Sequence, residues 1–316
     1  MMTLATSTEI PRRRRFRRSE PLWPVQITPR DLALIEHVRR HRFLSSVHLV
    51  ALDGGNKSNV LARLRVLFDS GYLDRPHAQL ASVPAIGNQP MVYGLGARGA
   101  RLLRQYGHLI TDSIDWTEKT KRAGAVFIDH TLAVADFMVR VELACRHTHR
   151  AEIIREGEII AGAPAATQTS REPLRWVVDR STNGRKQTWS VVPDALFGLR
   201  FPDETGTFVL LEIDRGTIPL LRNTESHRSI RRKLETYIEG WRAGRHLQQF
   251  GLKNLRVLVV TSSDARMQHM LDTVHAIAGG NGSGFLLFGS ATALAGQSPL
   301  EFAWTNGRGE AVRLTD

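Results

Sequence analysis

Apolar residues in the first third of the chain recur at helical spacing between recognisable caps. Thr28 and Pro29 open such a stretch, with Thr28 suited to cap a helix and Pro29 to begin it. A serine precedes a second, shorter stretch at 44–55, which stops at a glycine pair. A third stretch, 56–73, has one apolar stripe formed by Val60, Leu64, Leu67 and Phe68. The pattern predicts three consecutive helices.

Two short β segments and a fourth helix are predicted next. Residues 72–76 and 89–96 have the apolar, β-favouring composition of strands and flank a loop. Residues 97–107 return to helical spacing. Three helices followed by a two-stranded wing predict a winged helix-turn-helix domain, which we place at residues 25–110.

The remainder, residues 120–316, mixes helices with apolar strands. The predicted helices cover 125–148, 226–247 and 263–278. The predicted strands cover 151–160, 175–180, 186–200, 206–214, 255–261 and 284–288. Asn183-Gly184 is a strong hairpin turn signal between two of these strands. This order predicts a mixed β-sheet flanked by helices, an α+β or α/β domain.

Positive charge is concentrated toward the N-terminus. The net charge is +12, and residues 1–18 hold six arginines and one glutamate. Residues 19–110 hold 11 basic and 6 acidic residues, whereas residues 111–316 hold 26 and 24. Such asymmetry favours a polyanionic partner. Nucleic acid is favoured over membrane, because no amphipathic basic helix with a bulky apolar face accompanies the charge.

Two groups of residues are the predicted DNA contacts. The first is an arginine-rich arm within residues 1–24, expected to be disordered and to contact phosphate or a minor groove: Arg12, Arg13, Arg14, Arg15, Arg17 and Arg18. The second is the polar side of the third helix, with one residue after it that contacts phosphate: Lys57, Ser58, Asn59, Arg63, Arg65 and Arg75. The alternatives are a solvated tail and a winged helix that binds protein.

Composition indicates a soluble, cytoplasmic protein. No apolar run approaches the ~18 residues of a membrane span, and the N-terminus lacks the apolar segment of a secretory signal. The single cysteine, Cys145, excludes an intramolecular disulfide and a cysteine-built zinc site.

Carboxylates stand at the ends of two apolar runs, "VVPDALFGL" and "FVLLEIDRGT". Asp194 ends one, and Glu212 and Asp214 end the other. Strand side chains alternate between faces, so Glu212 and Asp214 point the same way. Three carboxylates that converge would suit Mg²⁺ or Mn²⁺ and would repel one another without a cation.

The order of elements around these acids resembles the restriction-endonuclease-like fold, whose signature is PD followed by (D/E)xK. Pro193-Asp194 and Glu212 match that signature, but Asp214 stands where the lysine belongs. The resemblance implies that Lys233, on the following helix, can replace the missing lysine. The alternative makes Lys233 an exposed cation and pairs Asp214 locally with Arg215 or Arg228.

The chain as a whole resembles the replication-relaxation family over residues 28–262. The motifs that carry this resemblance are "ITPRDLALIEHVRRHRFLSS", "YGLGARGARLL", "DHTLAVADF", "PDALFGL", "EIDRGT" and "RRKLETYIEGW". The resemblance implies a DNA-associated role in replication, mobilisation or gene regulation of a plasmid or other mobile element. The expected partners are double-stranded DNA and a relaxase, replication initiator or other mobile-element protein; a second copy of the chain is a further option.

Three functions remain open at this point. The favoured one is a DNA-binding accessory protein whose nuclease-like domain does not cleave. The alternative is a Mg²⁺- or Mn²⁺-dependent endonuclease that uses Asp194, Glu212, Asp214 and Lys233. A protein-interaction adaptor is the third.

Overall fold

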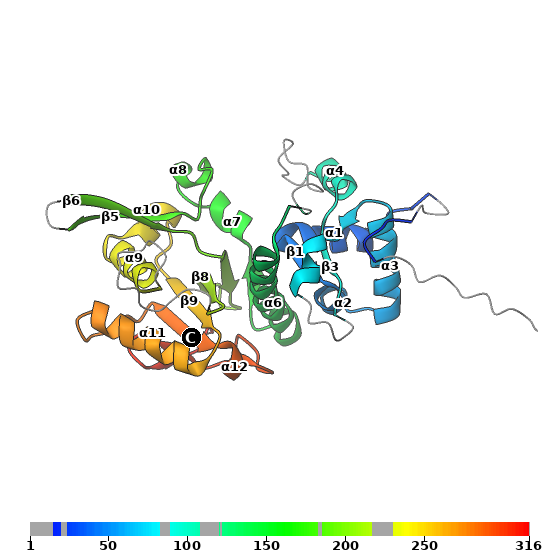
Figure 1. Cartoon of the computed structure of the whole chain (residues 1–316). Helices are drawn as coiled ribbons and strands as arrows, with labels where there is room; N and C mark the ends of the chain where they lie inside the picture. The colour runs from blue at the N-terminus through cyan, green and yellow to red at the C-terminus, as the bar shows by residue number, and fades with distance from the viewer. Residues whose placement is uncertain are drawn as a thin grey trace, which may run out of the picture. The chain divides into compact units, whose positions relative to one another are not determined.

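The computed structural model describes residues 15–19, 24–82, 89–107, 120, 122–182, 185–216 and 230–315. The chain divides into two compact units, Met1–Ala135 and Asp136–Asp316 (Figure 1). The division falls inside a long helix, α6 (Ala125–Thr148).

Unit 1 contains the four helices predicted for it. They are α1 (Pro29–His41), α2 (Ser46–Asp53), α3 (Lys57–Asp69) and α4 (Ala97–Gln105). The side chains of Thr28 and Asp31 each accept a hydrogen bond from the other's backbone N–H, which closes a capping box at the start of α1. Ser45 and Asn56 cap the next two helices. The predicted stripe on α3 is buried, and the caps explain why each helix begins where it does.

A small antiparallel sheet completes unit 1. Its strands are β1 (Phe43–Ser45), β2 (Leu73–Asp74) and β3 (Val92–Leu95), in the order β1-β3-β2. The two predicted β segments are confirmed as β2 and β3. Strand β1 was not predicted, because three residues are too few to show alternation. A 3-10 helix, η1 (His77–Ser82), lies within the predicted loop.

Unit 2 is built on a seven-stranded mixed sheet in the order β12-β11-β10-β9-β8-β7-β4. Its strands are β4 (Glu152–Ile154), β7 (Ala195–Arg200), β8 (Gly206–Asp214), β9 (Leu255–Thr261), β10 (Leu286–Ser290), β11 (Trp304–Asn306) and β12 (Ala311–Val312). Strand β9 pairs in parallel with β8 and with β10, and the other pairs among the described strands of this sheet are antiparallel. The predicted mixed sheet with helices, an α+β arrangement, is confirmed.

Helices flank this sheet, and apolar side chains of the helices and of the sheet together form the hydrophobic core of unit 2. The helices are α7 (Glu156–Ala161), α8 (Ala165–Gln168), α9 (Ile230–Arg242), α10 (Arg245–Phe250), α11 (Asp264–Ile277) and α12 (Ala291–Leu294), with the second half of α6. Leu234 and Tyr237 of α9 are buried in one cluster with Leu210, Val257 and Phe288 of the sheet. Burial of this apolar surface is the main term that fixes α9 on the sheet.

The hairpin predicted around Asn183-Gly184 is present, but it stands apart from the main sheet. Its strands β5 (Trp176–Thr182) and β6 (Arg185–Val191) form a separate two-stranded sheet. The single strand predicted at 186–200 is therefore wrong. It breaks into β6 and β7 around Pro193, which has no N–H for a strand ladder.

Two further corrections concern unit 2. The strand predicted at 151–160 ends after three residues, and α7 follows, with Glu156 and Glu158 in its first turn, where negative charge favours a helix. Residues 291–315, for which no element was predicted, add α12, β11 and β12. None of the helices described is both long and apolar enough to cross a membrane.

Candidate functional site

Adjacent strand ends bring Asp194 and Glu212 together. Strands β7 and β8 are antiparallel, and Ala195 pairs with Leu211. Just before β7, the Asp194 N–H donates to the Leu211 carbonyl at 2.9 Å. The Asp194 carboxylate in turn accepts from the Ile213 N–H at 2.7 Å. These two bonds fix Asp194 beside Glu212, one residue further along β8.

Helix α9 contributes two side chains to the same place. Lys233 Nζ forms an ion pair with Glu212 Oε2, and the Tyr237 hydroxyl donates to Glu212 Oε1 at 2.5 Å. Residues four apart lie on one face of a helix, so both reach the same carboxylate. We call Asp194, Glu212, Lys233 and Tyr237 the Glu212 cluster. Tyr237 is not among the residues predicted from sequence, although its spacing of four from Lys233 in "KLETY" is a usable signal.

Burial dominates the electrostatics of the Glu212 cluster. Glu212 is only 3% exposed, and burial raises its pKa to about 7, against the opposing attraction of Lys233. Burial works against the charge of Lys233 as well. Its pKa is nevertheless raised, because Glu212, Asp194 and Asp214 all attract the ammonium. Lys233 is therefore the charged member that holds the acids together.

Asp214 lies on the same face of β8 but is bound by a different cation. Its carboxylate accepts two hydrogen bonds from the Arg266 guanidinium of α11, one of them 3.0 Å between Nη2 and Oδ1. Thr261 donates to it as well, at 3.0 Å. The partner is distant in sequence, which differs from the local pair expected with Arg215 or Arg228. Arg228 lies outside the described residues.

The acids as arranged do not fit a divalent cation. Both oxygens of Glu212 and both oxygens of Asp214 accept hydrogen bonds from side chains of the protein. Across the described ranges, no group of three or more His, Cys, Asp or Glu is placed to hold a metal ion. Glu158, a nearby acid at the start of α7, pairs with Arg200 at 3.2 Å. Mg²⁺ and Mn²⁺ require an open set of oxygen ligands.

The N-terminal end of α3 is the exposed part of the predicted DNA-contacting helix. Lys57, Ser58 and Asn59 are all exposed. The nearest acid before them, Asp53, is bound by Arg30, with 2.6 Å between Arg30 Nε and Asp53 Oδ1. This pairing leaves the start of α3 with a positive and polar surface.

Two other arginines of α3 are engaged within unit 1. Arg63 donates to both oxygens of Asp31 at 2.6 and 2.7 Å. Although burial opposes the charge of Asp31, the hydrogen bonds from Arg63 and Thr28 lower its pKa. Arg65 forms an ion pair with Asp69 at 2.8 Å. Both arginines therefore have acidic partners within unit 1, and the DNA contacts expected of them from sequence stay a prediction.

The arginine-rich arm is partly ordered against unit 1. Arg75, expected to contact phosphate, is 6% exposed and donates to the carbonyl of Arg15 at 2.6 Å. Its guanidinium also lies over the Phe68 ring, 4.2 Å from the centroid. Arg18 pairs with Asp74 at 3.4 Å. Arg15 and Arg18 therefore contact other parts of unit 1. Arg17 is exposed, and Arg12, Arg13 and Arg14 lie outside the described residues.

A family model described as replication-relaxation matches residues 35–254, from α1 to the residue before β9. The chain belongs to the replication-relaxation family. The match includes α3, both strand ends that carry the acids, and α9. No curated protein and no solved structure matches the chain.

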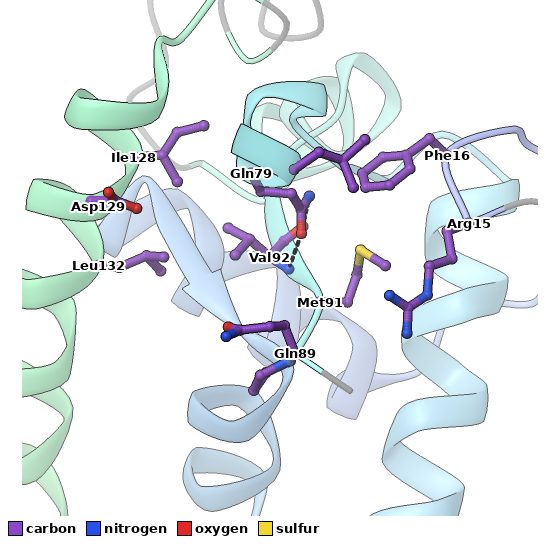
Figure 2. A pocket seen from close by; sticks show the side chains of 11 residues that line it. Arg15, Phe16, Gln79, Gln89, Met91, Val92, Ile128, Asp129 and Leu132 are labelled. Carbon is purple, nitrogen blue, oxygen red and sulfur yellow. Dashed lines mark hydrogen bonds between the residues drawn. The ribbon is translucent and has the colours of Figure 1, made fainter. Parts of the chain in front are cut away.

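This replication-relaxation protein also has a small cavity in unit 1, of about 140 Å³ (Figure 2). Its wall is largely apolar and includes Phe16, Met91, Ile128 and Leu132. The Gln79 amide, at its edge, accepts from the Val92 N–H at 2.9 Å. The cavity is mainly a packing feature between η1, β3 and the first turns of α6, and we assign no ligand to it.

Proposed function

We propose that this protein binds double-stranded DNA and serves the replication, mobilisation or gene regulation of a plasmid or other mobile element. Membership in the replication-relaxation family supports the role in replication or mobile elements. The positive charge of the first third of the chain supports DNA as the ligand. On this proposal α1 to α3 with β2 and β3 act as a winged helix-turn-helix. Strands β7 to β9 with α9 form a nuclease-like domain. A relaxase or replication initiator is the proposed protein partner.

The start of α3 is the observation that carries the DNA-binding proposal. A major groove accepts an α-helix, and side chains near the helix N-terminus reach base edges. Lys57, Ser58 and Asn59 are exposed there and offer one cation, one hydroxyl and one amide. Asparagine pairs well with adenine, whereas lysine contacts guanine or phosphate.

Substitution of Lys57 tests this contact. We expect Lys57→Gln to weaken binding to a labelled duplex and to reduce the slope of log K against log salt by about 1, because one phosphate-neutralising cation is lost. Fluorescence anisotropy over a salt series measures both quantities. Lys253→Gln, a change at another exposed lysine, serves as the matched control. A slope equal to that of the wild type would remove Lys57 from the interface.

We propose further that the nuclease-like domain does not cleave DNA. Lys233 and Arg266 neutralise Glu212 and Asp214 from within the chain, in place of an added cation. A domain whose acids are already paired with its own cations in this way is suited to bind DNA or a protein partner without cleavage.

One observation favours the second candidate, a metal-dependent endonuclease. Asp194, Glu212 and Lys233 meet at one point, as the (D/E)xK signature with a relocated lysine requires. Incubation of supercoiled plasmid with the protein and Mg²⁺ or Mn²⁺ separates the candidates. We expect intact plasmid and an unchanged melting temperature on addition of Mn²⁺. Nicking that disappears in Asp194→Ala and in Glu212→Ala would establish the endonuclease instead.

A further inference from the structure

The hairpin of β5 and β6, here called the ribbon, is a separate feature of unit 2 that contributes no residue to the Glu212 cluster. It is a two-stranded sheet of its own that extends beyond the body of unit 2 (Figure 1). Seven residue pairs, from Trp176↔Val191 to Thr182↔Arg185, join its strands. An exposed two-stranded hairpin gains little stability by itself, so the features that anchor it are informative.

The base of the ribbon is fixed on α9. Trp176 is fully buried, and its indole N–H donates to the Thr236 carbonyl at 3.3 Å. Helix α9 comes so close that a Cβ added at Gly240 would lie 1.9 Å from the indole nitrogen. Trp176 also stacks on Phe250, with 6.4 Å between ring centroids. The ribbon is therefore held at one end and exposed further out.

A stack of cations and one aromatic ring lies next to this base. Arg180 of β5 lies 4.4 Å from the ring centroid of Trp189, and Arg232 of α9 lies 4.5 Å from it. The indole thus holds two guanidinium groups in place. Glu235 contacts Arg180 at 3.6 Å and offsets part of this charge. The planar guanidinium groups keep hydrogen-bonding geometry suited to phosphate.

Beyond this stack, β6 presents a polar and positive surface. Three consecutive residues of β6 are exposed to solvent: Lys186, Gln187 and Thr188. Residues 175–191 contain three arginines and one lysine against a single aspartate. That aspartate, Asp179, accepts a hydrogen bond from Thr188 at 2.8 Å. The surface is complementary to a polyanion.

We infer that the ribbon is a second duplex-DNA contact, which enters a groove and is flanked by cations that contact the backbone. A major groove is about 12 Å wide and accepts a two-stranded β-ribbon, whose strands are ~4.8 Å apart. Arg180 and Lys186 contact phosphate from opposite faces of the ribbon, and Gln187, which pairs with Arg180 and lies on the same face, faces base edges. This inference rests on the proposed DNA-binding function and adds unit 2 to the interface.

The test uses the full chain and a fluorescein-labelled duplex of mixed sequence, with anisotropy measured over a salt series. We expect Lys186→Gln to lower the salt slope by about 1, and the double variant Arg180→Gln/Lys186→Gln to lower it by about 2. Affinity at physiological salt falls roughly three- to tenfold for the single variant. Lys253→Gln is the control and retains the wild-type slope. Far-UV circular dichroism verifies that each variant is folded.

Failure of this inference differs from failure of the proposed function. If the wild type binds and Lys57→Gln weakens binding, but both ribbon variants keep the wild-type affinity and slope, the ribbon contact is overturned and the proposed function stands. If the wild type binds no duplex, both are overturned. If the ribbon variants bind DNA normally but lose a protein partner, the ribbon is a protein-docking element.

Discussion

Lys233→Met should lower the free energy of unfolding of unit 2 by about 2 kcal/mol at pH 8. The variant leaves Glu212, which is 3% exposed, with Tyr237 as its remaining donor on α9. Removal of one partner of a buried pair often costs more. Here the cost is limited, because Lys233 is 29% exposed and Glu212 can take up a proton.

The loss should be smaller at pH 5.5 than at pH 8. The pKa of Glu212 in the folded protein is about 7, above its ordinary value of 4.5, so ionised Glu212 reduces stability as pH rises through that interval. Without Lys233 the pKa of Glu212 rises further, so the free energy of unfolding of the variant continues to fall above pH 7. The difference between variant and wild type therefore grows with pH.

Urea unfolding at both pH values measures this effect. Tryptophan fluorescence reports mainly on unit 2, which contains four of the six tryptophans: Trp176, Trp189, Trp241 and Trp304. Lys253→Met controls for the loss of an exposed lysine. The double variant Glu212→Gln/Lys233→Met should recover most of the stability, because it removes both charges of the buried pair and leaves neither without its partner. Equal losses at pH 5.5 and pH 8 would contradict the assigned pairing.

Arg266→Met should lower the free energy of unfolding by about 3 kcal/mol, which is the largest effect we expect. Asp214 and Arg266 have side chains that are 7% and 13% exposed, so the variant leaves an almost fully buried carboxylate that keeps the hydrogen bond from the Thr261 hydroxyl but loses its cation. The bond also joins α11 to the end of β8.

Arg231→Met is the matched control for this variant. Arg231 pairs with Glu235 at 3.0 Å, but it is 45% exposed, and exposed pairs contribute less than ~1 kcal/mol. Urea unfolding of both variants at pH 7 gives the comparison. Similar losses in the two variants would mean that Arg266 does not stabilise the protein through Asp214.

Local signals explain the successful part of the sequence analysis. Thr28, Ser45 and Asn56 start helices through hydrogen bonds that span two or three residues. The strands on either side of Asn183-Gly184 pair as the local turn signal predicts, although these two residues themselves lie outside the described residues. Alternation and helical spacing gave the strands and helices of the mixed sheet, because one buried face is visible in sequence.

The side-chain partners that could not be predicted from the sequence lie far apart along the chain. Arg266 reaches Asp214 from 52 residues away, and Arg63 reaches Asp31 from 32 residues away. The helical stripe of α3 correctly separated buried from exposed positions. It gave no information about the acid on α1 that binds Arg63. Lys233 could be proposed only because the family resemblance pointed to a relocated lysine.

Binding of the full chain to a labelled duplex with Mg²⁺ present, followed by analysis of the strand length, tests the central claim most directly. We expect a salt-dependent complex in which both DNA strands stay intact. The account would be contradicted by no complex at physiological salt, or by cleavage that Asp194→Ala and Glu212→Ala abolish.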